Sequence, residues 1–298
     1  MAFTQLNCGT NAGNTGLQNC NENFGQWQKL LLVNADFEIA TEAAAILEAT
    51  YETAINAAKA TRMYPLFDHF NAEVDQEERV TEEGWAGYTE TVREGKDRIT
   101  FQFKNMSLYN HKQLRTHMDR TNLGVYIITS QGYILGRTSG TKFLPLGLSD
   151  FYPGKRNISD GNTFDRSNVF IEFSDAKQWN DDGAYVKPTA FDPLLLDGIK
   201  DCYVSGTLAA TAGTITVQGA GDSVGVVGLV GANFNLYSDA APTVPLTVTL
   251  GTDNLDGTYD LTWASITGAH TIKLATQPIG TAGYESSPDA NGSASTTV

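Results

Sequence analysis

Four histidines are the side chains of this 298-residue sequence best suited to metal or acid–base chemistry: His69, His111, His117 and His270. His111 and His117 are six positions apart, which fits neither one helix face nor a standard zinc-binding pair. They would form a site only if folding brought them to Cys202 or Asp119. We therefore predict that the histidines are exposed or satisfied within the fold, and that the chain has no metal site.

Two aspartate-rich segments resemble calcium loops at first sight. The first, Asp253-Asn254-Leu255-Asp256-Gly257, has Leu255 where a calcium loop needs a further oxygen ligand. An Asp-Gly pair between strands is instead typical of a hairpin turn. The pair Asp160-Gly161 is read in the same way, so both segments are predicted to be turns rather than ion sites.

Catalytic motifs in their expected structural context are absent from the sequence. Gly221-Asp222-Ser223-Val224-Gly225 matches the G-x-S-x-G pattern, but it lies in a β-rich segment with no helix expected after it, so it is not interpreted as a nucleophile elbow. The sequence contains no H-E-x-x-H and no Walker A pattern. Gly219-x-Gly221 is followed by Gly225, which misses the dinucleotide fingerprint, and no helix is expected after it. Gly225, Gly228 and Gly231 are better explained by bulges or tight packing. Paired carboxylates need no motif. We nevertheless predict a non-catalytic protein without cofactor, and no catalytic, cofactor-binding or metal-binding residue is assigned.

The formal net charge of −14 argues against a protein that binds duplex nucleic acid, because phosphate binding requires a basic face. The most basic segment, His111–Arg120, holds Lys112, Arg115 and Arg120 together with Asp119. It is interpreted as a solvated face or a subunit contact.

The three cysteines, Cys8, Cys20 and Cys202, are widely spaced and odd in number, so buried free thiols are expected rather than a disulfide framework. No signal peptide is recognisable, because the N-terminus lacks an apolar core segment. No run approaches the ~18–20 apolar residues of a membrane span. These features predict a protein folded in the cytoplasm, with no membrane partner.

The N-terminal part has three expected segments. Residues 1–28 are rich in Asn and Gly and are predicted to form an extended arm that becomes ordered across a neighbour. Residues 36–62 carry apolar residues at helical spacing, from Phe37 to Ala58, and are predicted to be one long helix ending before Pro65. Residues 68–98 concentrate acidic residues and are predicted to be a loop with helical pieces.

Alternating patterns predict the strands of the N-terminal part. Ile99, Phe101 and Phe103 alternate with polar residues. Residues 125–129 and 133–135 flank Ser130-Gln131-Gly132 and predict a short hairpin. A loop rich in Gly and Pro is expected next, and then a strand at 169–173. Residues 29–200 are therefore predicted to be an α+β domain with an antiparallel β-sheet or barrel.

Composition changes near residue 200, after Pro188, Pro193 and Gly198. Beyond it the sequence is rich in Gly, Ala, Thr and Val, with one basic residue, Lys273. Regularly spaced strands are predicted at 202–208, 213–218, 224–230, 233–237, 244–250, 257–263 and 270–275, a pattern typical of a small β-sandwich over 201–284. Trp263 alternates with Tyr259 and Leu261 and is predicted to be buried. Residues 285–298 are predicted to be a flexible tail.

Residues 123–175 resemble tail-tube or ring-type proteins from phages of Bacteroidota hosts. The resemblance rests on the hairpin between Leu123 and Gly140, the Gly- and Pro-rich loop, and the strand within Asp165–Phe173. It covers about a sixth of the chain. It implies a subunit of a self-assembling ring or tube.

Residues 256–274 resemble the late strands of bacterial and filamin-type immunoglobulin-like repeats. The carrier is Asp256-Gly257-Thr258-Tyr259-Asp260-Leu261-Thr262-Trp263, followed by Gly268 and the strand Thr271–Leu274. Such domains are frequent appendages of phage tail, capsid and decoration proteins. The resemblance implies an immunoglobulin-like sandwich at the C-terminus.

Together these features predict a structural virion protein of a tailed bacteriophage, most directly a tail-tube or major tail protein that forms rings around a DNA conduit. Expected partners are further copies, other virion proteins and DNA passing without sequence-specific binding, since acidic walls repel phosphates. The expected location is the virion, assembled in the host cytoplasm. Two alternatives stay open: a capsid, head-decoration or connector protein, and a carbohydrate-binding, adhesin-like module with Trp179 or Trp263 as platform.

Overall fold

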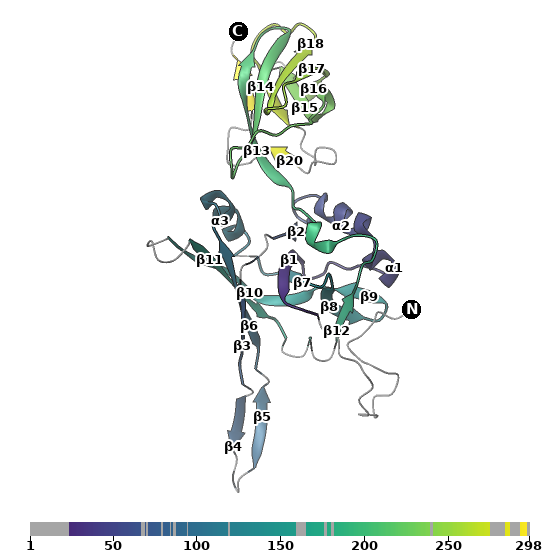
Figure 1. Cartoon of the computed structure of the whole chain (residues 1–298), viewed down its shortest axis with the longest axis vertical. Coiled ribbons are helices and arrows are strands. Elements are labelled where there is room, and N and C mark those ends of the chain that lie inside the picture. Colours follow the sequence, from purple (N-terminus) through teal and green to yellow (C-terminus); the bar gives the residue numbers. More distant parts are fainter. Residues whose placement is uncertain are drawn as a thin grey trace. The chain divides into compact units, whose positions relative to one another are not determined.

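The computed structural model describes residues 24–66, 69, 71–78, 80–83, 85, 88–93, 95–118, 120–158, 165–175, 178–179, 182–238, 241–274, 284–286 and 293–296. The chain divides into two compact units, Met1–Gly198 and Ile199–Val298. The sequence placed this boundary at 200/201. Both units consist mainly of antiparallel strands (Figure 1).

The first unit, unit 1, contains the strands β1 (Trp27–Asn34), β2 (Tyr64–Pro65), β3 (Asn71–Gln76), β4 (Val80–Glu83), β5 (Thr89–Arg93), β6 (Asp97–Lys104), β7 (Leu123–Thr129), β8 (Ile134–Ser139), β9 (Lys142–Leu144), β10 (Leu146–Asn157), β11 (Arg166–Phe173) and β12 (Gly183–Val186). Its helices are α1 (Glu42–Ala45), α2 (Glu48–Ile55) and α3 (Leu108–Arg115), and a 3-10 turn, η2, spans Pro193–Leu195.

A large antiparallel sheet organises unit 1. Its main path runs β12-β8-β7-β10-β11-β6-β3, and β1 pairs with both β7 and β2. Alternation along β6 and β11 sends Ile99, Phe101 and Val169 to one face, where they join a core that also includes residues of β1, β7 and β10. The ring of Trp27 on β1 lies 6.5 Å from that of Phe101 on β6, so the sheet curls around this core.

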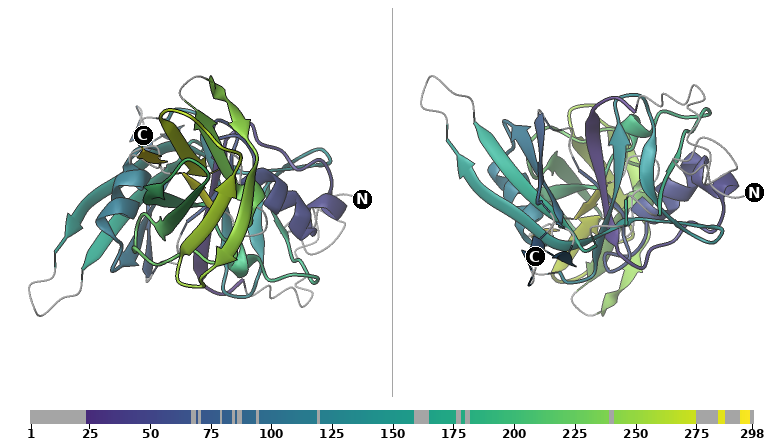
Figure 2. Two further views of the ribbon diagram at one scale, coloured as in Figure 1. Left: turned by 90° about the horizontal axis from the view of Figure 1, so that it is seen from above. Right: turned by 90° about the horizontal axis from the view of Figure 1, so that it is seen from below.

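Strand β7 is covered on both faces, and all seven of its residues are buried. Val125 and Ile127 point into the core described above. On the opposite face, the Tyr126 ring packs against Phe143 and its hydroxyl donates to the Phe143 carbonyl at 3.0 Å. Figure 2 shows β1 lying beside β7. The continuous apolar run of residues 125–128 reflects this double coverage.

The prediction of one long helix over 36–62 is wrong. Ile39 and Phe143 exchange two backbone hydrogen bonds of 2.9 Å, which hold residue 39 in an extended bridge before any helix begins. The side chain of Thr41 then caps α1. Leu47 adopts extended dihedral angles between α1 and α2, so the helix is interrupted. The apolar spacing was real, but tertiary pairing decided where helices form.

The prediction of a loop with helical pieces over 68–98 is also wrong, because β3, β4, β5 and the start of β6 occupy this segment. The expected Gly- and Pro-rich loop after β8 is likewise replaced by β9 and the twelve-residue β10. β10 accommodates Pro153 and Gly154 where its pairing with β11 shifts register between Pro153 and Arg156. The hairpin at 125–135 is confirmed: β7 pairs with β8, and Gly132 at the turn has φ +76.

The second unit, unit 2, contains β13 (Lys200–Leu208), β14 (Ala212–Gly219), β15 (Phe234–Ser238), β16 (Ala241–Leu246), β17 (Val248–Asp253), β18 (Thr258–Trp263), β19 (His270–Leu274), β20 (Tyr284–Ser286) and β21 (Ser293–Thr296), with a 3-10 turn, η3, at Gly231–Asn233.

Two sheets in unit 2 share one core. One has the order β17-β18-β14-β13-β20 and the other β16-β15-β19-β21. Their buried side chains form a single cluster, which includes Ile215, Tyr259 and Leu236. Trp263 is 8% exposed and belongs to this core, as predicted. The sequence therefore located the buried face of β18 correctly.

Two strand predictions in unit 2 need correction. Residues 224–230 form no regular strand, because Gly225 lies against the backbone of Asp256 and Gly228 has φ +85. The predicted strand 244–250 is two strands, β16 and β17, which belong to different sheets. The chain changes sheet at Thr247, as corners of β-sandwiches do.

The two predicted ends are only partly described. Residues 1–23 of the expected arm lie outside the described residues, and β1 already begins at Trp27. Most of the predicted tail, 285–298, also lies outside them. The parts of it that are described are strand: β20 ends at Ser286, and β21 pairs along the edge of β19. The prediction of a flexible tail did not take into account that β19 offers an edge to which a further strand can pair.

Candidate functional site

The most distinctive surface of unit 1 is the ribbon, defined here as β4 and β5. These strands pair with each other and with no other described strand. They continue in the direction of β3 and β6, away from the sheet (Figure 1). Trp85 between them is 97% exposed and Tyr88 is 80% exposed, and Val80 and Val92 are also exposed. A two-stranded ribbon is marginally stable in water, so this exposed apolar surface is suited to burial against a partner.

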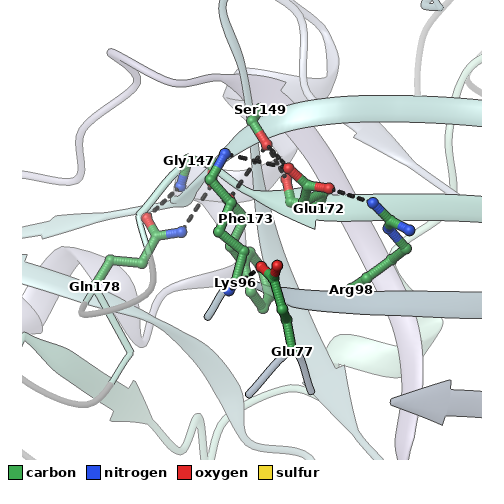
Figure 3. A network of polar contacts seen from close by, with 8 residues as sticks. All are labelled: Glu77, Lys96, Arg98, Gly147, Ser149, Glu172, Phe173 and Gln178. Atoms are coloured by element: carbon green, nitrogen blue, oxygen red, sulfur yellow. Dashed lines mark hydrogen bonds and ion pairs between the residues drawn. The ribbon is translucent and has the colours of Figure 1, made fainter. Parts of the chain in front are cut away.

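An ionic network fixes the base of the ribbon to the outer face of the sheet (Figure 3). Glu172 on β11 stands opposite Arg98 on β6 and accepts a 2.7 Å hydrogen bond from its guanidinium. Lys96 donates to the same carboxylate at 3.2 Å and Ser149 at 2.9 Å. The hydrogen bond from Arg98, followed by those from Ser149 and Lys96, lowers the pKa of Glu172 to about 2. The carboxylate therefore stays ionised and joins β6, β10 and β11.

Backbone bonds extend this base toward the ribbon. The Glu77 amide donates to the Lys96 carbonyl at 3.3 Å, and the Lys96 amide donates to the Glu77 carboxylate at 3.2 Å. Behind the network, the buried Gln178 accepts from the Gly147 amide at 2.8 Å and donates to its carbonyl at 2.9 Å. The ribbon thus leaves the sheet from a firmly bonded platform.

The inner face of the unit 1 sheet, near this ionic network, is apolar. A pocket of about 400 Å³ is lined by the following residues: Trp27, Val74, Asp97, Ile127, Leu135, Leu146, Phe173 and Trp179. Asp97 is the one titratable side chain among these lining residues, and burial raises its pKa. Among the described lining residues, no second acid–base group or nucleophile, of the kind that hydrolytic chemistry uses, accompanies Asp97.

The histidines weighed in the sequence do not come together. His117 packs against the Tyr64 ring at 4.6 Å, and its Nδ1 lies 3.1 Å from Arg120. Burial, followed by the charge of Arg120, lowers the pKa of His117 to about 4. His270 lies in unit 2 between two carbonyls, those of Gly268 and Ala209. Among the described residues, no group of three or more His, Cys, Asp or Glu side chains is placed to hold a metal ion.

His69 packs edge-on against Phe101 at 4.8 Å between ring centroids. Cys202 is a free, buried thiol in unit 2, and burial raises its pKa to about 12. Asp119, Cys8 and Cys20 lie outside the described residues. The described side chains, His69 and Cys202, are thus packed within unit 1 and unit 2 respectively.

The aspartates of 253–257 form a turn, as predicted. Asp253 accepts from the amides of Leu255 and Gly228 at 2.9 and 2.8 Å. Asp256 accepts from the Thr258 amide at 2.9 Å. Gly257 has φ +90 and joins β17 to β18. These carboxylates are used in ordering the turn. The second pair, Asp160-Gly161, lies outside the described residues.

Tight packing explains Gly225 and Gly231, as predicted, whereas Gly228 has open space around it and a φ of +85. A Cβ on Gly225 would lie 2.2 Å from the Asp256 carbonyl oxygen, and one on Gly231 would lie 2.7 Å from that of Val248. Of the two tryptophans named for the carbohydrate-binding alternative, Trp263 is buried, and Trp179 is half-buried against the core of unit 1.

Sequence reasoning missed the ribbon, although a signal was available. β-branched residues stand on both sides of Gly84 and Gly87 in the sequence, including Val80, Thr81 and Val92. This arrangement is typical of a hairpin. The surrounding glutamates obscured it, because acidic residues are depleted in ordinary, half-buried strands.

Comparison with known proteins leaves the family open: no protein-family model matches the chain, and no curated protein matches it significantly. Within the part of the chain that the structure describes, no helix combines the length and apolar character needed to cross a membrane.

Proposed function

We propose that the chain is a structural, non-catalytic virion protein of a tailed bacteriophage, and that it is a tail-tube or major tail subunit assembling into rings that form a DNA conduit. The observation that carries this proposal is the ribbon, which projects from the sheet and exposes Trp85 and Tyr88. A monomer gains nothing from holding such residues in water, whereas a subunit of an assembly buries them on a neighbour.

The rest of unit 1 supports a structural role. Its curled antiparallel sheet is stabilised by its own core, and the ionic network at Glu172 braces the point where the ribbon leaves. A stiff body with a projecting, partly apolar element is suited to repeated subunit contacts. The acidic balance of the chain favours passage of DNA over its retention, because negative walls repel phosphates.

Unit 2 is proposed to be an immunoglobulin-like appendage on the outside of the assembly. The two sheets of unit 2, in which most strands pair antiparallel, enclose one core and support this proposal. The turn at Asp256-Gly257 before β18 supports it as well. Residues 201–298 carry one basic and eight acidic residues, a composition suited to a solvated surface. Further virion proteins and DNA in transit are the proposed partners, and the virion, assembled in the host cytoplasm, is the proposed location.

Sedimentation and negative-stain electron microscopy of the purified full-length chain test the proposal. Rings, or tubes of stacked rings, are expected at high protein concentration. Closed shells or binding to preformed capsids would indicate a capsid or head-decoration protein instead. A strictly monomeric chain that binds glycans through Trp85 would contradict the proposal and favour an adhesin.

The division of work between the units has its own test. Removing residues 201–298 should leave assembly intact, since the ribbon and its base belong to unit 1. A truncated protein that is folded, by circular dichroism, and yet never assembles would show that unit 2 belongs to the assembly interface.

A further inference from the structure

The ribbon and the adjoining parts of β3 and β6 carry a concentrated negative charge. Residues 71–97 contain nine acidic and three basic residues, a net charge of −6. Glu82 on β4 stands directly opposite Glu90 on β5, and both are exposed. Like charges directly opposite each other destabilise a strand pair. A cationic surface from outside the ribbon would offset this repulsion.

A cationic surface lies at the other end of the same strands. We call it the basic end, and it consists of six residues: Lys104, Lys112, Arg115, Lys155, Arg156 and Arg166. Lys104 closes β6 and stands opposite Arg166, which opens β11. Figure 1 shows α3, which carries Lys112 and Arg115, at the end of the sheet opposite the ribbon.

Contacts hold the basic end together. The Arg115 guanidinium donates to the Pro153 carbonyl at 3.4 Å, which joins α3 to β10. Asp165 forms an ion pair with Arg156. Burial lowers the pKa of His111, and the nearby positive charges of Arg115 and Arg156 lower it further. The net charge of the whole chain is negative and therefore does not reveal this local cluster of basic residues.

Apolar residues accompany the charges on both surfaces. Leu108 at the start of α3 is 71% exposed, and Ile158 just after β10 is 82% exposed. The ribbon offers Trp85 and Tyr88. Each surface therefore combines uncovered apolar side chains with an excess of one charge, negative on the ribbon and positive at the basic end.

We propose that the ribbon of one copy docks on the basic end of a second copy. This inference rests on the proposed self-assembly and names the surfaces that carry it. Because the two surfaces differ and lie at opposite ends of one sheet, the contact is head-to-tail and repeats from copy to copy. The eight residues of β6, at ~3.3 Å per residue, separate the surfaces by roughly 26 Å.

A nucleic acid is the other anionic occupant that the basic end would accept. The observations favour the ribbon, because phosphates would leave Leu108 and Ile158 uncovered, whereas Trp85 and Tyr88 would cover them. The ribbon is also the most acidic projecting element of unit 1 that the structure describes.

Paired charge reversals in the full-length chain test the proposal. One variant carries Glu82→Lys and Glu90→Lys, which keeps the cross-strand repulsion and reverses only the sign shown to a partner. The other carries Lys112→Glu and Arg115→Glu. Each alone should raise the concentration needed for assembly, measured by sedimentation, at least about tenfold. An equimolar mixture of the two, or one chain with all four substitutions, should assemble again.

The control matched to the ribbon variant is Glu48→Lys with Glu52→Lys on the exposed face of α2, which also replaces two glutamates by lysines but lies outside both surfaces. It should assemble as the wild type does. A labelled DNA duplex is the second probe, and the wild type should not bind it.

The outcomes separate the two proposals. A wild type that never assembles contradicts both. A wild type that assembles while either variant assembles equally well, or while folded variants fail to rescue each other, overturns the head-to-tail contact alone. Duplex binding that Lys112→Glu/Arg115→Glu abolishes, with assembly unchanged, would assign the basic end to nucleic acid and also overturn it.

Discussion

Strand β7 and the ribbon are both β-structure in unit 1, yet their surroundings are opposite. Every residue of β7 is buried, between the core on one face and the layer of Phe143 and Tyr126 on the other. Every residue of β4 is exposed. Both segments pair as antiparallel strands, and burial distinguishes a strand held by its own chain from one suited to be held by a neighbour. Substitutions in the two regions should therefore affect different measurements.

The largest loss of subunit stability is expected from Phe101→Ala. Phe101 is fully buried on the inward face of β6, and truncating a large core aromatic costs roughly 3–5 kcal/mol. Calorimetry of the full chain should show the transition of unit 1 at lower temperature. Val92→Ala on the ribbon is the control and should stay within about 0.5 kcal/mol. Equal losses of stability from Phe101→Ala and Val92→Ala would contradict the contrast between the buried core and the exposed ribbon.

An intermediate loss is expected from Gln178→Ala at the platform behind the ribbon. The buried Gly147 amide would lose its 2.8 Å acceptor, and an unsatisfied buried donor costs about 1–3 kcal/mol. Chemical denaturation measures the change. Gln102→Ala provides the comparison, because its 3.2 Å hydrogen bond to Glu73 lies on the exposed face. If Gln102→Ala lowered the free energy of unfolding as much as Gln178→Ala does, burial of the hydrogen bond would not explain the loss.

A smaller, pH-dependent loss is expected at Glu172. Its pKa is about 2 in the folded chain against 4.5 ordinarily, so its ionised form stabilises the fold above pH 4.5. That contribution should disappear as the pH falls from about 4.5 to about 2. Because the partner side chains are partly exposed, the effect should be below about 1 kcal/mol. Glu172→Gln should flatten this part of the stability–pH curve, and an unchanged curve would exclude the network as its source.

The smallest effect on the isolated subunit is expected from Trp85→Ala. Its side chain is almost wholly exposed, so the free energy of unfolding should change by no more than about 0.5 kcal/mol. Assembly should nevertheless weaken strongly, since buried tryptophans dominate interface energetics. Trp85→Phe should retain more assembly than Trp85→Ala. A variant that is destabilised but still assembles would reverse the assignment of the ribbon.

Local pattern predicted the elements whose surroundings are ordinary. Strands β6, β7, β8 and β11 follow from alternation or apolar runs and a glycine turn. Trp263 was placed correctly, because a strand with one buried face fixes its neighbours two positions away. The helix at 36–62 could not be corrected from sequence, because the bridge between Ile39 and Phe143 joins residues 104 positions apart.

The candidate surfaces were harder to predict, for the same reason. The acidic residues of 68–98 were recognised, but not that they stand on paired strands. The segment around Lys112 and Arg115 was interpreted as a solvated face or a subunit contact. Its partners Lys155, Arg156 and Arg166 come from other strands, and only the pairing of β6, β10 and β11 gathers them.

The outer edges of the ribbon, which have no partner strand among the described residues, have a consequence for the free chain. An exposed strand edge is a template on which another chain can add a strand, which leads to aggregation. The outer edges of β4 and β5 carry no partner strand among the described residues, and Glu82, Glu83 and Glu90 stand on them. Two ribbons that approach edge to edge bring these carboxylates together and repel. We therefore expect the glutamates to keep free chains from aggregating through their ribbons, and high salt, which screens these charges, should promote that aggregation.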